Sequence, residues 1–396
     1  MSRRTWLLLH RWAGLFMAGF LIVAGLTGSV IVFEHELDRW LNSHLVVVKP
    51  RGNPLPPAEL RAIAERAVPA GRIDVINLRR APDESAVFPV SPRDKGVNLG
   101  FNVIHLDPYT GRVLGTREPG ATRLDREHIV AFLYRLHYTM ALPEPWGRWL
   151  FGIVALIWTL DCFVGVYLTL PRTRFNFLAR WMPAWQIKWR ASAARVNFDL
   201  HRAAALWTWA MLLILAVSSV QLNLYSELFA PALGKLLPLE NVRENIHREL
   251  SSAGRTDAEP MAWDVALARG RELIAQRAER DGFSVESETS LSLARAFGVF
   301  AYRLRSTLDI DNRYGRTIVY FSAADGQELS FEHPYMASGN AVIRWLAMLH
   351  FGHIWGMPFR ILLFIMGVVV TLLSVTGVII WWKKRKARIH ASVGAS

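Results

Sequence analysis

The chain has 396 residues, of which 52% are hydrophobic and only 20% are charged, a balance that argues against an ordinary soluble enzyme. Its single cysteine excludes an intramolecular disulfide, a four-cysteine zinc site and a cysteine-ligated iron–sulfur cluster within one chain. The 46 Lys and Arg residues outnumber the 33 Asp and Glu residues, so the net charge is +13. Where the extra basic residues lie along the chain decides which kind of partner they indicate.

Four long apolar runs predict four transmembrane helices, at residues 12–33, 149–170, 203–224 and 361–382. Each run has 22 residues, which as a helix rise about 33 Å, enough to cross the hydrocarbon core of a bilayer. The first run is too long for a signal peptide and no A-x-A cleavage pattern follows it, so we interpret it as a retained anchor. The lipid bilayer is therefore an expected partner.

The excess positive charge lies in three segments: the N-terminus, the loop between the second and third runs, and the C-terminal tail. Together they carry 15 basic residues and one acid, Asp199. By the positive-inside rule these segments are cytoplasmic, so both termini lie inside and two large segments lie in the periplasm. The basic residues lie at helix ends and form no compact basic face, so no nucleic-acid partner is expected.

The two halves of the chain repeat each other. Residues 9–11 read Leu-His-Arg before the first run, and residues 200–202 read the same before the third run, 191 positions later. A Leu-His pair at 136–137 precedes the second run and another at 349–350 precedes the fourth, 213 positions later. We infer an internal duplication whose halves run in the same direction, related by a pseudo-two-fold axis along the membrane normal.

The segments between the runs also repeat a small α+β pattern. Residues 55–117 predict a helix (58–68) and short strands that end in a hairpin. Residues 258–329 predict a helix (266–281) followed by strands such as 300–305 and 317–321. The predicted fold class is a four-span α-helical bundle with internal duplication and two small α+β modules.

The predicted organisation has eight segments. They are residues 1–34 (N-terminus and first helix), 35–147 (first periplasmic segment, with its module at 55–117), 148–171 (second helix), 172–201 (cytoplasmic loop), 202–225 (third helix), 226–360 (second periplasmic segment, with its module at 258–329), 361–382 (fourth helix) and 383–396 (basic tail).

The duplication sorts four histidines into two pairs at two depths. His10 and His201 lie at the cytoplasmic helix entrances, and His137 and His350 lie just outside the membrane before the second and fourth helices. Two opposed imidazoles are what a six-coordinate b-type haem requires as axial ligands, and no C-x-x-C-H motif would attach it covalently. A hydrogen-bonded or snorkelling histidine is the alternative for each position. Repetition in register favours iron ligation.

Four arginines accompany these histidines: Arg11, Arg202, Arg148 and Arg360. Arginines at helix ends mostly act as topology anchors, although each could also pair with a haem propionate. We therefore count them as candidate cofactor-binding residues.

Two further polar positions stay open. Asp161 lies in the middle of the second run, where a carboxylate must be neutral or partnered. It could belong to a proton path, or it could bond Thr159, Tyr167 or a polar group on a neighbouring helix. His353 shares a helical face with His350 as a possible metal pair, and no histidine corresponds to it in the first half.

The chain resembles the PepSY-associated transmembrane family over nearly its whole length. The likeness rests on Leu-His-Arg-Trp at 9–12, the Leu-His pairs before the second and fourth helices, Gly-x-Tyr-Leu at 165–168, and Asp-Pro-x-Thr-Gly at 107–111. The second module departs from this pattern with Ser-Ala-Ala-Asp-Gly at 322–326. Some members carry a fused flavin reductase domain, whereas only a short tail follows the fourth helix here.

The best-understood members are FoxB-type ferric-siderophore reductases of the bacterial inner membrane. This resemblance implies two b-type haems per chain, with His10, His201, His137 and His350 as iron ligands. The chain would then carry electrons from a quinol or a cytoplasmic reductase to a periplasmic ferric siderophore or other ferric chelate, and release the iron. No nucleophile or acid–base residues are expected, because the cofactor performs the chemistry.

Two alternatives come from other functional classes. The first is a non-redox sensor or assembly protein whose modules bind a peptide or an envelope protein. The second is a transporter, which the duplication and Asp161 favour, although no unwound helix is indicated in both halves. Haem content separates the reductase from both.

Overall fold

The structure is a computed structural model that describes residues 2–119, 121–242, 244–246 and 259–393. Four of its helices are long and apolar enough to cross a membrane. They are α1 (Arg3–Ile31), α6 (Trp146–Thr169), α8 (Ala193–Asn223) and α13 (Gly356–Val393). Each contains most or all of one predicted run, so the prediction of four helices suited to a membrane is confirmed. Residue 258, where the second module was expected to begin, and the tail residues 394–396 lie outside the described residues.

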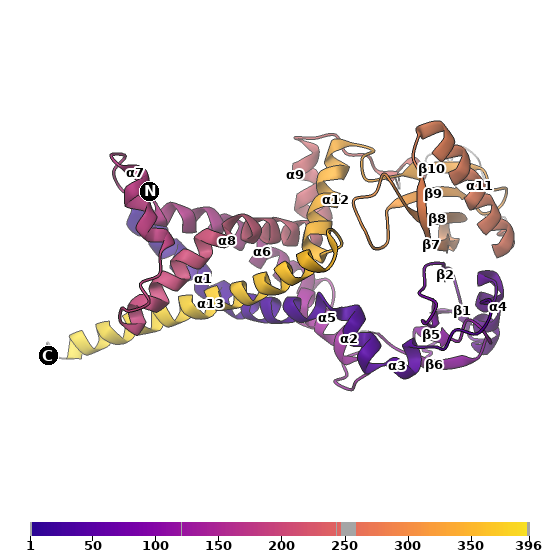
Figure 1. Cartoon of the computed structure of the whole chain (residues 1–396), viewed down its shortest axis with the longest axis horizontal. Coiled ribbons are helices and arrows are strands. Elements are labelled where there is room, and N and C mark those ends of the chain that lie inside the picture. Colours follow the sequence, from indigo (N-terminus) through magenta and orange to yellow (C-terminus); the bar gives the residue numbers. More distant parts are fainter. Residues whose placement is uncertain (1, 120, 243, 247–258, 394–396) are drawn as a thin grey trace.

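The four long helices form one bundle. Helix α1 packs on α13, and α6 packs on α8. Gly25 and Gly367 allow the first of these contacts, because a Cβ on Gly25 would lie 2.5 Å from the Gly367 carbonyl oxygen. The strands lie at one end of the bundle and both chain termini at the other (Figure 1). We call these the sheet end and the terminal end.

Helices α1 and α8 begin well before their apolar runs. The Ser2 hydroxyl caps α1 by accepting a hydrogen bond from the Thr5 N–H. His10 and His201 therefore lie within continuous helices, and the prediction that they sit at helix entrances needs this correction. Hydropathy marks where a helix enters hydrocarbon, whereas the backbone hydrogen bonds continue through the polar residues on either side.

Two shorter helices come directly before α6 and α13. They are α5 (Ile129–Thr139), which packs against α1 and α6, and α12 (Ser338–Phe351), which packs against α8. Both end at a residue with positive φ, 53° at Met140 and 72° at Gly352, which turns the chain into the following long helix. His137 and His350 lie in the last turns of these two helices.

The remaining helical segments are short, with the exception of α4 and α11. They are α2 (Glu34–Leu41), α3 (Ser43–Val46), α4 (Pro57–Ala67), α7 (Phe177–Trp181), a 3₁₀ turn (Met182–Trp185), a π-helical turn (Tyr225–Phe229), α9 (Ala230–Gly234), α11 (Trp263–Asp281) and a 3₁₀ turn (Arg295–Phe297).

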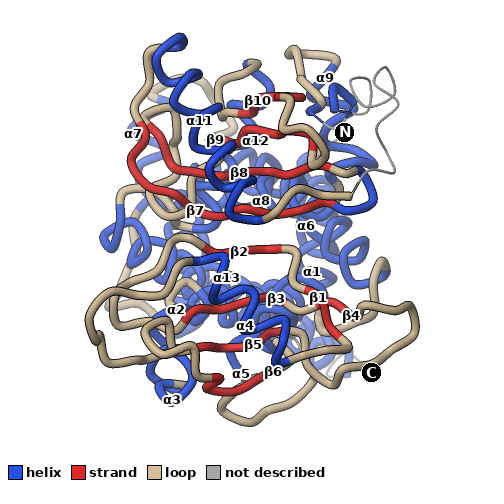
Figure 2. The backbone as a smooth tube through the Cα atoms, turned by 90° about the vertical axis from the view of Figure 1, so that its right-hand side faces the viewer, coloured by secondary structure: helices blue, strands red, loops and turns tan. Residues whose placement is uncertain are grey.

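The strands form three antiparallel sheets in the described residues (Figure 2). The strands are β1 (Gly71–Arg72), β2 (Val75–Asn77), β3 (Ala86–Pro89), β4 (Ser91–Pro92), β5 (Val103–Leu106), β6 (Val113–Arg117), β7 (Val285–Ala294), β8 (Val299–Ser306), β9 (Thr317–Ser322) and β10 (Glu328–Glu332). The sheet orders are β10-β9-β8-β7-β2, β3-β5-β6 and β1-β4.

The two outer segments share a sheet, which the expectation of two separate modules did not include. Strand β2 of the first segment pairs with β7 of the second, with Ile76 opposite Leu291. Trp263 packs against the hydrophobic cores of both segments. Alternating apolar residues indicate that a strand exists, but they do not indicate which edge it joins.

Candidate functional site

Two pairs of histidines face each other across the bundle. The ring centres of His10 and His201 are 6.3 Å apart, and those of His137 and His350 are also 6.3 Å apart. The first pair joins α1 to α8, and the second joins α5 to α12. The structure therefore brings together the four histidines that the repeats predict to be partners.

This spacing fits one metal ion held between two imidazoles. A metal–imidazole bond is about 2 Å long, and each ring nitrogen lies about 1 Å from its ring centre, given bonds of about 1.3 Å. Two imidazoles that bind one metal from opposite sides thus have centres about 6 Å apart. Both pairs meet this requirement.

The sheet-end histidines are oriented through Nδ1. The Nδ1 atom of His137 lies 3.0 Å from the Ala24 carbonyl oxygen and 3.1 Å from Thr27 Oγ1. His350 Nδ1 lies 2.8 Å from the Ser218 hydroxyl oxygen. Such bonds fix the ring and leave Nε2 as the ligand nitrogen. Because Ala24 and Thr27 belong to α1, His137 lies beside a helix that is long and apolar enough to cross a membrane.

The terminal-end histidines are oriented in the same way but by different partners. His201 Nδ1 lies 3.0 Å from both the Leu373 carbonyl oxygen and Thr376 Oγ1. His10 Nδ1 lies 2.9 Å and 3.0 Å from the two carboxylate oxygens of Asp161. The prediction that Asp161 bonds a polar group on a neighbouring helix is confirmed, although no signal in the sequence identified His10 as that group.

Glycines leave room for two of these rings. A Cβ on Gly28 would lie 2.9 Å from His137 Cε1, and one on Gly377 would lie 3.2 Å from His201 Cε1. A Cβ on Gly165 would lie 3.8 Å from His10 Cε1, which is an ordinary contact distance. The glycines of the spanning helices therefore permit a close approach of imidazole to helix backbone.

A cavity of about 480 Å³ surrounds the terminal-end pair, with His10 and His201 in its lining. Its wall is mainly apolar and includes Trp158 and Trp209. Four basic residues also contribute to the lining: Arg11, Arg202, Lys384 and Arg385. A largely apolar pocket with a few convergent charges suits a flat hydrophobic cofactor that carries carboxylates at one edge. The residues present thus fit a haem.

The two sheet-end arginines have carboxylate partners of their own. Arg148 Nη2 donates to Glu227 at 2.7 Å, and Arg360 Nη2 donates to Glu36 at 2.6 Å. These hydrogen bonds lower the pKa of Glu36 and that of Glu227 to about 2. Arg148 and Arg360 therefore tie helices together at the sheet end, and Arg202 is similarly paired with Asp199. The repeated glutamates at 36 and 227 are the sequence signal for these pairs.

His353 packs among aromatic rings. Its ring contacts the rings of Tyr314 at 5.6 Å and Phe351 at 5.8 Å. Within the described part of the chain, no group of three or more His, Cys, Asp or Glu side chains could hold a metal ion, and a metal pair of His350 and His353 stays a prediction. Burial lowers the pKa of His353 to about 4, so it is neutral at pH 7.

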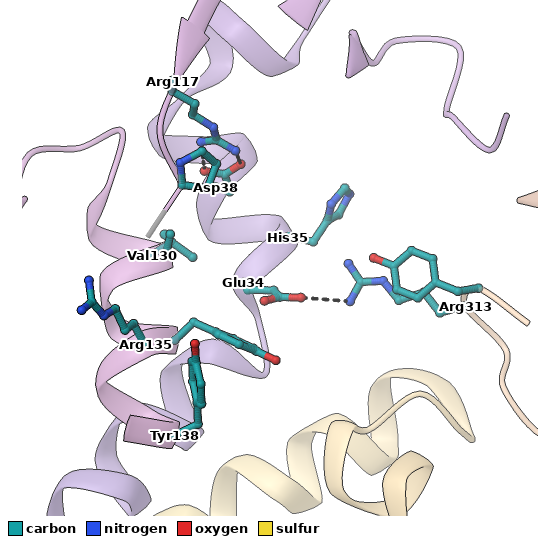
Figure 3. Close-up of a pocket in the computed structure, with 12 residues that line it drawn as sticks. Glu34, His35, Asp38, Arg117, Val130, Arg135, Tyr138 and Arg313 are labelled. Carbon is teal, nitrogen blue, oxygen red and sulfur yellow. Dashed lines mark hydrogen bonds and ion pairs between the residues drawn. The ribbon is translucent and has the colours of Figure 1, made fainter. Parts of the chain in front are cut away.

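A second cavity, of about 690 Å³, lies at the sheet end (Figure 3). Its lining comes from α2, α5, the residues around the end of β6, and the loop after β8. Arg117 donates to both Asp38 oxygens at 2.8 Å, and Arg313 lies 3.7 Å from Glu34. Sequence reasoning missed this cavity, because its walls come from segments nearly 200 residues apart.

Comparison with known proteins gives one match. A family model described as the PepSY-associated TM region matches residues 7–384. No curated protein matches the chain. The family resemblance inferred from the residue motifs is confirmed.

Proposed function

The chain belongs to the PepSY-associated transmembrane family, and we propose that it is a haem b reductase of the bacterial inner membrane, of the FoxB type. It would carry electrons across the membrane to a ferric siderophore or other ferric chelate. One observation carries this proposal: facing histidine pairs with the spacing of a bis-imidazole metal site occur at both ends of the bundle.

The proposal includes the internal duplication and two related outer modules. Thr27 and Ser218 lie 191 positions apart, and each bonds the Nδ1 of a sheet-end histidine. Arg148 of the first half pairs with Glu227 of the second, and Arg360 of the second half pairs with Glu36 of the first. Such exchanged pairs are what a pseudo-two-fold axis between the halves produces.

The terminal end would face the cytoplasm. The N-terminus, helix α7 in the central loop, and the basic tail all lie at this end (Figure 1), and these segments hold the unbalanced positive charge. The sheets would then lie in the periplasm. Electrons would enter at His10 and His201 and leave at His137 and His350.

The distance between the pairs explains why two are needed. His137 packs against Ala24 and Thr27 of α1, the helix that also carries His10. The helical rise between these positions is about 20–25 Å. A single cofactor could not reach both ends of this distance, whereas one cofactor at each end would leave a single gap, shortened by the width of the two macrocycles, for electrons to cross.

The chain's own residues would bind and orient the cofactor. The four imidazoles would hold the group through Nε2, their Nδ1 bonds would fix each ring, and the apolar wall of the terminal-end cavity would exclude water. Arg11, Lys384 and Arg385 would bind the acidic edge of the group at the terminal end. A bound haem supplies one-electron chemistry. Reduction of chelated Fe(III) lowers its charge and so weakens its hold on hard oxygen ligands.

The test is haem content. The purified chain should show a b-type spectrum and about two haems per chain by the pyridine haemochrome assay. His137→Ala or His350→Ala should each remove one haem, whereas the exposed control His44→Ala should retain both. A colourless protein after expression with ample haem would contradict the proposal and favour the non-redox sensor. Reduction of a ferric chelate by the chemically reduced protein then tests the activity itself.

A further inference from the structure

The sheet-end cavity is placed to receive a ligand that both outer segments contact. Glu34, Asp38 and Tyr134 belong to α2 and α5, whereas Arg313 and Tyr314 belong to the loop between β8 and β9. In Figure 3, Glu34 and Asp38 lie between Arg117 above and Tyr138 below, and Arg313 faces Glu34 across the cavity. Its volume of about 690 Å³ falls within the range of small-molecule sites.

Rings in contact connect this cavity to His350. Tyr314, in the cavity wall, lies 5.6 Å from His353 between ring centres. His353 lies 5.8 Å from Phe351, and Phe351 lies 5.8 Å from His350. The opposite wall contains Tyr138, the residue next to His137. His350 is thus linked to the cavity by a series of ring contacts, and His137 is linked to it through the backbone, as the neighbour of Tyr138.

The charges of the lining favour one kind of ligand. Arg117 and Arg313 pair with the two carboxylates of the lining, those of Asp38 and Glu34. The wall therefore presents guanidinium groups whose charge these carboxylates balance, and tyrosine hydroxyls add hydrogen-bond donors. Guanidinium and phenol groups together suit an oxygen-rich ligand of zero or negative charge.

The two carboxylates of the lining come from the first half of the chain. The residues 191 positions after Glu34 and Asp38 are Tyr225 and Phe229. Aromatic residues thus stand in the second half at the positions that correspond to both carboxylates, so this part of the lining is not a feature that the two halves share.

We propose that this cavity is the docking site of the electron acceptor, a metal chelate rich in hard oxygen donors with zero or negative net charge. Tyr314, His353 and Phe351 provide its path to His350. This inference rests on the proposed function and adds where the acceptor binds and which charge it has. Transfer of one electron from a haem held by His137 and His350 would reduce the chelated iron from Fe(III) to Fe(II) and leave the haem iron as Fe(III). No bond to the protein forms or breaks.

Docking can be measured without electron transfer. Gallium(III) has the charge of Fe(III) and is not reduced under these conditions, so a neutral gallium trihydroxamate serves as the probe. Calorimetry with the full chain in detergent should detect binding, and Tyr134→Ala and Arg313→Gln should each weaken it at least tenfold. The matched control is Tyr225→Ala, an exposed tyrosine of the other half, which should bind as the unmodified chain does.

Two outcomes of this measurement would overturn the docking site: no gallium binding by the unmodified chain, or equal weakening by Tyr225→Ala. A cationic hexaammine cobalt(III) complex should not compete with the probe. Competition by that cation would refute the inferred charge of the ligand.

The path to His350 needs a kinetic measurement. Phe351→Leu should slow reoxidation of the reduced sheet-end haem by a ferric trihydroxamate at least tenfold in stopped-flow experiments, with gallium binding and haem content unchanged. An unchanged rate would refute the path. If the chain holds no haem, the proposed function fails, and the gallium measurement still decides whether the cavity binds a chelate.

Discussion

Replacing Asp161 with asparagine is expected to raise the reduction potential of the proposed terminal-end haem and to leave the sheet-end haem unchanged. In the described structure, Asp161 is the one carboxylate that bonds Nδ1 of a paired histidine. The other three histidines bond carbonyl or hydroxyl oxygens. A carboxylate partner makes the imidazole more basic, which favours Fe(III) over Fe(II).

The size of the shift follows from the distances. An iron midway between rings whose centres are 6.3 Å apart would lie about 7 Å from the Asp161 carboxylate, given a metal–nitrogen bond of about 2 Å. With an effective dielectric constant of about 20, one charge at this distance contributes about 2 kcal/mol. For a one-electron couple this energy equals about 100 mV. The Asp161 side chain is only 12% exposed, so screening by water is limited.

The assay is a spectroelectrochemical titration that resolves both haems. The lower potential should rise by about 100 mV in Asp161→Asn. Thr376→Val is the matched control, because it removes an uncharged partner from His201 of the same pair and should cause a much smaller shift. Ser218→Ala removes the hydroxyl that bonds His350 and should shift only the potential of the sheet-end haem, so it shows which of the two potentials belongs to that haem. An unchanged potential in Asp161→Asn, or an equal shift in Thr376→Val, would refute the reasoning.

Three further predictions concern packing and pH. Gly28→Ala should displace the His137 ring and lower haem content toward one per chain, whereas Gly19→Ala, which meets open space outside both histidine pairs, should retain both haems in the pyridine haemochrome assay. Burial lowers the pKa of His105 to about 4 from 6.5, so its contribution to stability is complete above pH 6.5 and falls by up to about 3 kcal/mol toward pH 4. Thermal melts at pH 7 and 4.5 should show a smaller acid effect in His105→Phe than in the unmodified chain, and an equal effect would contradict this. Arg360 lowers the pKa of Glu36 to about 2 from 4.5, so the stability that this pair adds is present above pH 4.5 and disappears toward pH 2. Because Glu36 is 45% exposed, Glu36→Gln should cost less than about 1 kcal/mol at pH 7, and a loss of several kcal/mol would indicate another role.

The sequence predicts the helices and the histidine pairs because both depend on patterns within the chain. Apolar runs locate α1, α6, α8 and α13, and the 191- and 213-residue offsets pair His10 with His201 and His137 with His350. Side-chain partners between helices leave no such pattern. The bond from Asp161 to His10 depends on the rotation of α6 against α1, which hydropathy does not fix.

The strand pairing was unpredictable for a similar reason. Strand β2 has three residues and joins the edge of a sheet built from residues 285–332. Helix α4 packs on the hydrophobic core of the first outer segment, and α11 packs on that of the second. Trp263 contacts both cores and so holds the two segments together where β2 pairs with β7. The sheet-end cavity depends on this arrangement as well, since the loop with Arg313 and Tyr314 extends from the shared sheet toward α2.

The differences between corresponding residues of the two halves would favour electron transfer in one direction. A bundle with two identical haem sites would hold electrons equally well at both ends. Asp161 differs from Leu373, the residue 212 positions later, and places a negative charge beside the terminal-end pair alone. Glu34 and Asp38 differ from Tyr225 and Phe229, and they line the proposed acceptor cavity at the sheet end. A lower potential where electrons enter and a docking site where they leave would both favour transfer toward the sheets. On this proposal, duplication would supply two metal-binding positions, and the differences between the halves would set the order in which electrons use them.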